Sequence, residues 1–255
     1  MAIGKQDFLG LTFDALDVDG AVDALLDYPR GSAFAYLVTP NVDHVVRMHD
    51  KAQPDLAEIR AAYAGAQWCV CDSRVLALLA RRAGLRLPVA PGSDITAKFL
   101  ARLPDGVTVT VIGSDAGQRP LLAARYPGLR FRYFVPPMGL RWNAAALDAA
   151  ADFVAAESGS TALLAVGAPQ QELLAARLRA RGARGVGLCI GASLEFLTGR
   201  QRRAPRLMQK LALEWLFRLL SNPRRLARRY LVDGPKIFAL ASAARATSSR
   251  TRVDN

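Results

Sequence analysis

Short apolar runs alternate with amphipathic stretches through the first 199 residues, and this alternation limits the fold more than any other feature of the sequence. The candidate strands are the apolar runs 34–39, 68–71, 107–113, 129–135, 161–166 and 186–190. The candidate helices between them lie at about 43–63, 73–83, 94–103, 116–126, 143–157 and 169–181. Strands that alternate with helices are typical of a parallel sheet covered by helices. The sequence therefore predicts an α/β fold with a Rossmann-like, open and mostly parallel sheet.

The charge of the chain is concentrated at its C-terminal end. The formal net charge is +12 over 255 residues, but residues 200–255 hold 14 Lys and Arg against three acidic residues, a net charge of +11. The first 199 residues are nearly neutral. We therefore predict an α/β body over 1–199 and a basic helical appendage over 200–255.

The appendage has a helical apolar stripe flanked by cations. We expect one helix from Pro205 to the break at Asn222-Pro223, then basic helices from about 224 to 231 and from 235 to 246. The first of these would carry a stripe of Leu207, Leu211, Trp215 and Leu219. Such a stripe can pack onto the body or lie on a membrane surface between basic side chains. Both hypotheses stay open, and each can hold for one face of the appendage.

Composition excludes several classes of protein. The three cysteines are odd in number and lie in apolar runs, so we expect buried thiols and a cytoplasmic protein. Neither a signal peptide nor an apolar run of ~18 residues is evident. A basic tail also suits nucleic acid, but this one interleaves arginine with leucine and tryptophan, which favours an anionic lipid surface. We therefore expect a membrane partner and no nucleic-acid partner.

Polar residues follow the first and second predicted strands, where parallel sheets bind ligands. Thr39 and Asn41 can hold a sugar or ribose, or cap the next helix. Asp72 stands at the tip of an apolar run, where a carboxylate can act as a general base towards a hydroxyl or serve as an N-cap. Gly92 and Asp94 open a helix whose free amides favour a phosphate. Each pair of alternatives stays open from these residues alone.

Two further strand ends carry glycine-containing loops. Gly113 begins a flexible loop, and Gly167 begins the segment Gly-Ala-Pro-Gln-Gln-Glu, whose Gln171 and Glu172 cluster behind a proline that opens a helix. This combination favours a binding loop over a plain turn. The only histidines, His44 and His49, stand five residues apart, a poor spacing for sharing a metal, so we expect neither a metal nor a cofactor.

Together these residues resemble the WecG/TagA/CpsF glycosyltransferases, glycosyltransferase family 26. The resemblance covers about residues 8 to 240, and its most specific block is the last. It rests on Thr-Pro-Asn-Val-Asp-His from residue 39, Asp72, Gly92-Ser93-Asp94, Gly-Ala-Pro-Gln-Gln-Glu from residue 167, and the run GASLEFLTGRQRRAPRLMQKLALEWLFRLLSNPRRLARRYL.

The resemblance implies an inverting, metal-independent transferase that moves a hexose-type sugar from a UDP-sugar to a polyprenyl-diphosphate-linked saccharide. It implies that Asp72 is the general base and that Thr39, Asn41 and Gln171 bind the donor. We add Gly92, Asp94, Gly113, Gly167 and Glu172 to the expected donor site. The appendage would dock peripherally on the inner face of the cytoplasmic membrane and close the active site. Its arginines would cover the diphosphate, and the leading candidates are Arg202, Arg203, Arg206 and Arg224.

The sequence departs from the family pattern at three places. Cys71-Asp72-Ser73 stands where the family commonly has Pro-Asp-Gly, Val89 replaces an arginine, and Leu140 replaces an aromatic residue. These changes indicate a capsule or exopolysaccharide enzyme with a donor other than N-acetylmannosamine. The polymer predicted overall is an exopolysaccharide, a capsule or a cell-wall polymer. A catalytically inactive scaffold in polysaccharide assembly is the alternative, against which Asp72 argues. The oligomeric state, including a homo-oligomer, is left open by the sequence.

Overall fold

The computed structural model describes residues 4–157 and 159–253 and contains a six-stranded parallel sheet. The strand order is β4-β3-β8-β7-β5-β6. The six predicted strands and the α/β class are confirmed. The strands are β3 (Ala35–Val38), β4 (Trp68–Cys69), β5 (Thr108–Ile112), β6 (Arg130–Phe134), β7 (Ser160–Leu164) and β8 (Gly185–Cys189).

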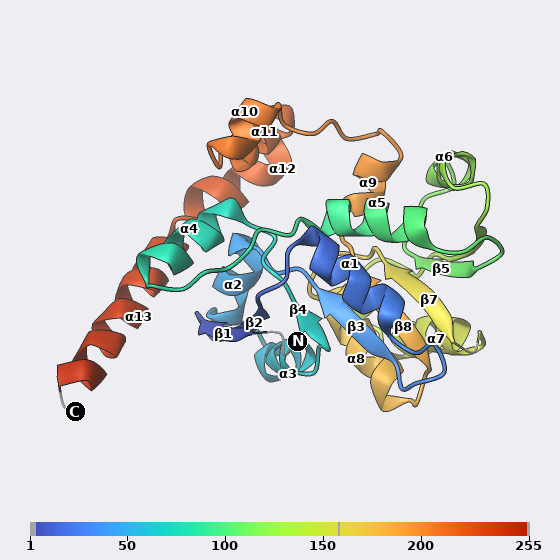
Figure 1. Ribbon diagram of the computed structural model, residues 1–255, viewed down its shortest axis with the longest axis horizontal. Helices are drawn as coiled ribbons and strands as arrows, with labels where there is room; N and C mark the ends of the chain where they lie inside the picture. Colours follow the sequence, from blue (N-terminus) through green and yellow to red (C-terminus); the bar gives the residue numbers. More distant parts are fainter. Residues whose placement is uncertain (1–3, 158, 254–255) are drawn as a thin grey trace.

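Helices cover both faces of the sheet (Figure 1), which explains why its central strands are apolar almost throughout. One face packs against α1 (Val18–Asp27), α5 (Gly92–Arg102), α6 (Gln118–Arg125) and α9 (Ser193–Leu197). The other packs against α2 (Val42–Met48), α3 (Leu56–Ala64), α4 (Arg74–Arg82), α7 (Ala144–Ala155) and α8 (Gln170–Ala180). Alternate residues of one strand serve the two cores: Leu163 lies in the first, and Ala162 and Leu164 lie in the second.

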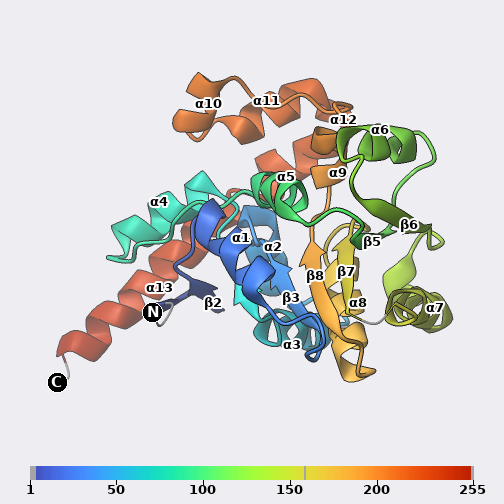
Figure 2. The same ribbon diagram turned by 45° about the vertical axis from the view of Figure 1, so that its right-hand side comes forward.

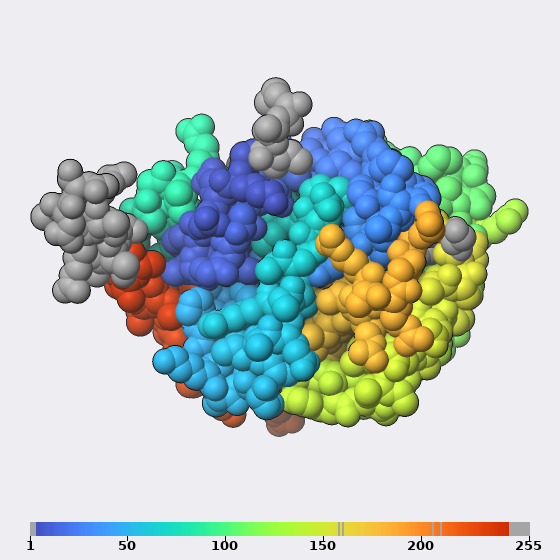
Figure 3. Space-filling view, turned by 90° about the horizontal axis from the view of Figure 1, so that it is seen from below, coloured from blue at the N-terminus to red at the C-terminus, as the bar shows by residue number. Residues whose placement is uncertain are grey.

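An antiparallel hairpin that the sequence did not reveal precedes the sheet. It consists of β1 (Lys5–Phe8) and β2 (Leu11–Asp14). The carboxylate of Asp14 accepts a hydrogen bond of 2.9 Å from the amide of Cys69, so the hairpin is tied to the edge strand β4. Figure 3 shows this part of the surface, with the hairpin in dark blue beside the light-blue and cyan segment that includes α3.

The appendage consists of short helices followed by one long helix. They are α10 (Arg206–Lys210), α11 (Glu214–Ser221), α12 (Pro223–Ala227), the π-helical η2 (Arg228–Asp233) and α13 (Lys236–Val253). The expected single helix from Pro205 to Asn222 is wrong, because Ala212 adopts a left-handed φ of 60° between α10 and α11. The stripe is therefore divided. Leu207 and Leu211 are exposed, whereas Leu219 is buried.

The two parts of the appendage lie against different sides of the body. Figure 2 shows α10, α11 and α12 above the end of the sheet towards which β8 points. Helix α13 runs past α2 and extends away from the body towards the C-terminus (Figure 1). Its Ile237 and Ala241 are buried in the core that α2 also lines. The appendage is therefore packed onto the body through apolar contacts, as one of the two hypotheses expected.

Candidate active site

A cavity of about 530 Å³ lies at the carboxyl end of the sheet, between the body and the appendage. Its floor is formed by residues that follow β3, β4, β7 and β8, and its roof by residues of α11, η2 and the start of α13. The predicted site residues among its lining are Thr39, Asn41, Asp72, Gly167, Gln171, Arg202 and Arg203. The fold thus brings together residues that are up to 164 positions apart in the chain.

Asp72 is held in this cavity by the backbone that follows β4. Its amide donates a hydrogen bond of 3.1 Å to the carbonyl of Pro40, which ties the segment to the end of β3. Helix α4 is capped by Ser73, whose hydroxyl accepts from the amide of Leu76 at 3.2 Å. The N-cap interpretation of Asp72 is therefore wrong for α4. Its carboxylate lines the cavity and accepts a hydrogen bond from the amide of Gly92 at the start of α5.

The surroundings of Asp72 disfavour its charge. Burial under the appendage raises the pKa of this carboxyl to about 7, while the guanidinium of Arg218 acts in the opposite direction. Glu214 also lies close enough to raise the pKa of Asp72. A carboxylate whose pKa is near neutrality is suited to accept a proton from a hydroxyl.

Thr39 lies beneath the start of α5, and Gly92 makes room for it. A Cβ at Gly92 would lie 2.9 Å from Oγ1 of Thr39, closer than any real side chain approaches. The first residue of α5 is therefore a glycine because the hydroxyl that lines the cavity occupies the space. Asn41 has two roles, since its Oδ1 caps α2 by accepting from the amide of Asp43 at 3.0 Å and it also lines the cavity.

Gln171 links two loops of the cavity floor. Its Nε2 donates to Oε1 of Glu172 at 2.9 Å, and its Oε1 accepts from the amide of Gly191 at 2.8 Å. Glu172 itself is buried behind Gln171 and does not line the cavity, and burial raises the pKa of Glu172 to about 6. Gly167 lines the cavity with a φ of 78°, a conformation that favours glycine.

The other predicted residues lie outside the cavity lining. Asp94 forms an ion pair with Arg203, and neither Ser93 nor Asp94 caps α5. Gly113 has a φ of 96°, and its Cβ would lie 2.7 Å from Val166, so this glycine is explained by packing at the end of β5. Arg224 is exposed on α12. The side chain of Arg206 falls outside the part of the chain that the structure describes.

Several cavity residues were not singled out as site residues from the sequence. Arg218 of α11 contributes to the charge around Asp72 and lies over the ring of Phe196, 5.1 Å from its centroid. Arg229 of η2 reaches Asp43 at 3.4 Å. The abundance of arginine in the appendage was the only indication of these residues in the sequence. Which arginines face the cavity depends on how the appendage packs on the body.

Ion pairs join the appendage to loops at the carboxyl end of the sheet. Arg200 contacts Asp115 after β5, Arg203 contacts Asp94 and Ser93 at the start of α5, and Arg229 contacts Asp43 at the start of α2. The appendage is therefore held by ion pairs at three loops of the body, those that follow β5, precede α5 and precede α2.

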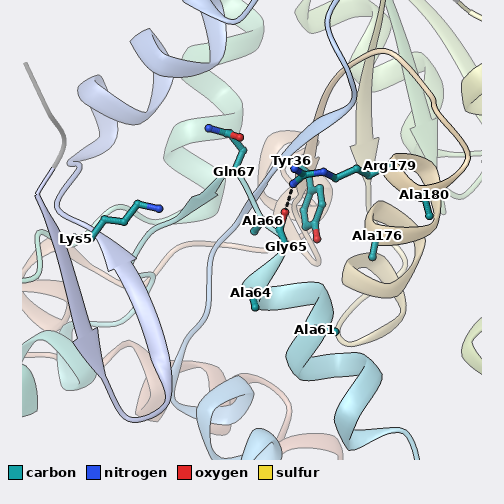
Figure 4. A pocket seen from close by; sticks show the side chains of 10 residues that line it. All are labelled: Lys5, Tyr36, Ala61, Ala64, Gly65, Ala66, Gln67, Ala176, Arg179 and Ala180. Carbon is teal, nitrogen blue, oxygen red and sulfur yellow. Dashed lines mark hydrogen bonds between the residues drawn. The ribbon is translucent and has the colours of Figure 1, made fainter.

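A second hollow of about 500 Å³ lies at the opposite, amino end of β3 and β4 (Figure 4). Tyr36 in it donates a hydrogen bond of 2.5 Å to the carbonyl of Ala62, and Arg179 donates to the carbonyl of Gly65. These polar groups hold the end of α3, and none of the predicted site residues lines this hollow. The cavity under the appendage is therefore the candidate active site.

The matching family model is the Glycosyl transferase WecG/TagA/CpsF family, and it covers residues 6–251 of the 255. The chain belongs to this family of glycosyltransferases. Membership implies a sugar donor and an acceptor substrate, and the cavity is of a size suited to small-molecule ligands.

The described residues bear on two further points, metal binding and membrane crossing. They contain no cluster of three or more His, Cys, Asp and Glu side chains arranged to hold a metal ion. Within the same part of the chain, none of the helices combines the length and the apolar character needed to cross a bilayer.

Proposed function

We propose that this glycosyltransferase moves a hexose-type sugar from a UDP-sugar to a polyprenyl-diphosphate-linked saccharide, with inversion at the anomeric carbon. The polymer would be an exopolysaccharide, a capsule or a cell-wall polymer. The observation that carries the proposal is the position of Asp72, at a strand end inside a cavity that arginines of the appendage cover.

In this proposal Asp72 is the general base. Its carboxylate takes the proton of the acceptor hydroxyl as that oxygen attacks the anomeric carbon. The bond between the anomeric carbon and the UDP oxygen breaks on the opposite face, and this geometry inverts the configuration. The raised pKa of Asp72 supports the role, because a carboxylate of ordinary acidity is a weaker base.

The leaving UDP carries a developing negative charge, which cationic side chains must stabilise. Arg218, Arg202 and Arg203 line the cavity and supply that charge. We propose that they do so without a metal ion and that Arg218 contributes more than Arg203, whose guanidinium already pairs with Asp94. Addition of EDTA tests this part directly. Loss of activity that Mg²⁺ or Mn²⁺ restores would contradict it.

The cavity floor would bind the donor. Thr39 and Asn41 offer a hydroxyl and an amide to the sugar, and Gln171 fixes the Gly191 loop at the end of β8. Since Gln171 already bonds both Glu172 and Gly191, we assign Gln171 and Glu172 to the shape of the donor site. Gly92 would support the donor site because its lack of a side chain leaves room for the hydroxyl of Thr39.

The outer side of the appendage would dock on the inner face of the cytoplasmic membrane. Exposed apolar side chains occur along it beside many cations, a combination suited to anionic lipid. They are Leu207, Leu211, Leu220, Leu231, Val232 and Phe238.

A donor panel tests the proposed function. The intact chain is incubated with membranes that contain lipid-linked precursors and with labelled UDP-, GDP- and ADP-sugars. We expect label in the lipid phase from a UDP-sugar alone. No transfer from any UDP-sugar, or equal transfer from the other nucleotide sugars, would overturn the assignment of the donor.

A further inference from the structure

One wall of the cavity carries charged and polar groups that the mechanism above does not use. It lies between α2 and η2. The carboxylate of Asp43 contacts Arg47 at 3.1 Å and Arg229 at 3.4 Å, and His44 follows Asp43 on α2. All four residues line the cavity. Two guanidinium groups thus share one carboxylate, which leaves a net positive charge on this wall.

Two nitrogen atoms on the same wall have no hydrogen-bond partner. They are Nδ1 of His44 and Nε of Arg229, and both are buried. Burial lowers the pKa of His44 to about 4, so its imidazole is neutral beside the two arginines. Buried polar atoms are normally paired, because an unpaired one costs free energy. The accessible parts of the two guanidinium groups can bind a ligand that offers acceptor oxygens. A small rotation of the His44 and Arg229 side chains would then give the two buried nitrogens a partner as well.

Apolar side chains continue from this wall to the molecular surface. Tyr230, which follows Arg229 in the chain, and Pro235, six residues after Arg229, both line the cavity. Phe238 lines the cavity too, yet it is 53% exposed, so it stands at the mouth. Leu231 and Val232, which follow Tyr230 in the chain, are exposed as well. The cationic wall is therefore connected with solvent, or with a membrane, by an apolar border.

We propose that this wall, with Arg47, His44 and Arg229, binds the diphosphate of the acceptor, and that the first isoprene units of the acceptor run along Pro235 and Phe238. The inference rests on the proposed function and assigns a site within it. A diphosphate matches the charge and the unpaired nitrogens, and an isoprenoid chain matches the apolar border. UDP joins its diphosphate to a polar nucleoside instead of an apolar chain, so we assign it to the other arginines of the cavity, Arg202, Arg203 and Arg218.

Calorimetric titration of the intact chain with farnesyl diphosphate, and separately with UDP, tests the assignment. The variants are Arg47→Gln and His44→Phe, both in the body, so the appendage keeps its own residues. We expect each to weaken farnesyl diphosphate binding by about tenfold, since each removes a hydrogen bond to a charged group. UDP affinity should change less than about twofold, because in this assignment neither Arg47 nor His44 contacts UDP. Arg82→Gln, at the exposed end of α4, is the matched control and should change neither affinity.

The arms of the titration separate the alternatives. Weakened UDP binding with unchanged farnesyl diphosphate binding would assign the wall to the donor and overturn the inference. Equal weakening of both ligands, or of neither, would also overturn it, and a thermal melt of each variant reveals a folding defect. Absence of farnesyl diphosphate binding in the unmodified chain overturns the site alone. The proposed function is judged separately, by transfer from UDP-sugars.

Discussion

Asp72 lies where burial opposes its ionisation, and this gives a prediction for the pH dependence of catalysis. A base must be deprotonated to work, and the pKa of Asp72 is raised to about 7. We expect kcat/KM to fall about tenfold per pH unit below that value and to level off above it. A steady-state pH profile measures this limb. A profile that stays flat down to pH 5 would contradict the assignment of Asp72 as the base.

The same shift predicts a cost in stability. The folded state raises the pKa of Asp72 above its ordinary value of 3.8, so the buried carboxylate destabilises the fold at all pH values above about 7. This cost declines as the pH falls and disappears below the unfolded pKa. We therefore expect Asp72→Asn to raise the melting temperature at pH 8 and to leave it nearly unchanged at pH 3.5. An equal effect at both pH values would show that charge burial is not the cause.

At the scale of elements, apolar periodicity was sufficient to find the six strands of the sheet. Apolar periodicity was insufficient to find the ends of helices where one predicted helix contains a turn. The expected helix 43–63 is two helices, α2 and α3, because the segment with Pro54 and Asp55 interrupts it. The hairpin β1-β2 was missed because its strands, with the sequences KQDF and LTFD, contain charged and polar residues and form no continuous apolar run.

The candidate site was predictable where it depends on strand ends and unpredictable where it depends on docking. Thr39 and Asp72 follow strands, so a parallel sheet brings them together. Arg218 and Arg229 line the cavity because α11 and η2 fold over the sheet. Arg224, an equally basic candidate, is exposed instead. Apolar periodicity does not show which of these arginines faces the cavity. The chain changes direction at Ala212, so a helical pattern counted from α10 does not continue into α11.

Arg218 provides a prediction for the appendage as an element. We expect Arg218→Met to lower kcat by about 10²-fold, since it removes a charge from the leaving-group region. It should also move the acid limb of the pH profile to higher pH, because Arg218 lowers the pKa of Asp72. Measured beside Arg82→Met as a control, a loss of kcat without movement of the limb would place Arg218 away from Asp72 in the working enzyme.

At the scale of the whole molecule, the appendage has a net charge of +11 and the body is nearly neutral. Some apolar side chains of the appendage are buried and others are exposed. Each engaged cation contributes about 1 kcal/mol at an anionic membrane surface, so several together hold a protein peripherally. We expect the intact chain to float with anionic vesicles at low salt and to dissociate as salt screens the charges. Failure to float at low salt would contradict membrane docking.

Removal of the appendage after Gly199 should release the chain from these vesicles and abolish transfer, because Arg202, Arg203 and Arg218 are removed with it. Buried side chains such as Leu219 and Ile237 are also lost, so a thermal melt must accompany the assay.

The double variant Leu207→Ser, Leu211→Ser changes exposed residues alone. It should weaken vesicle binding while transfer to a short-chain, detergent-soluble acceptor continues. Equal loss of both activities would show that these leucines support the active site.

The rate of sugar transfer by the Asp72→Asn variant, compared with the unmodified chain, tests the central claim most directly. Both proteins are given the UDP-sugar that the donor panel selects and a polyprenyl-diphosphate-linked acceptor, and label in the lipid phase is followed with time. We expect the variant to be slower by about 10²-fold or more, with UDP affinity nearly unchanged. Near-normal transfer by the variant would remove Asp72 from the mechanism.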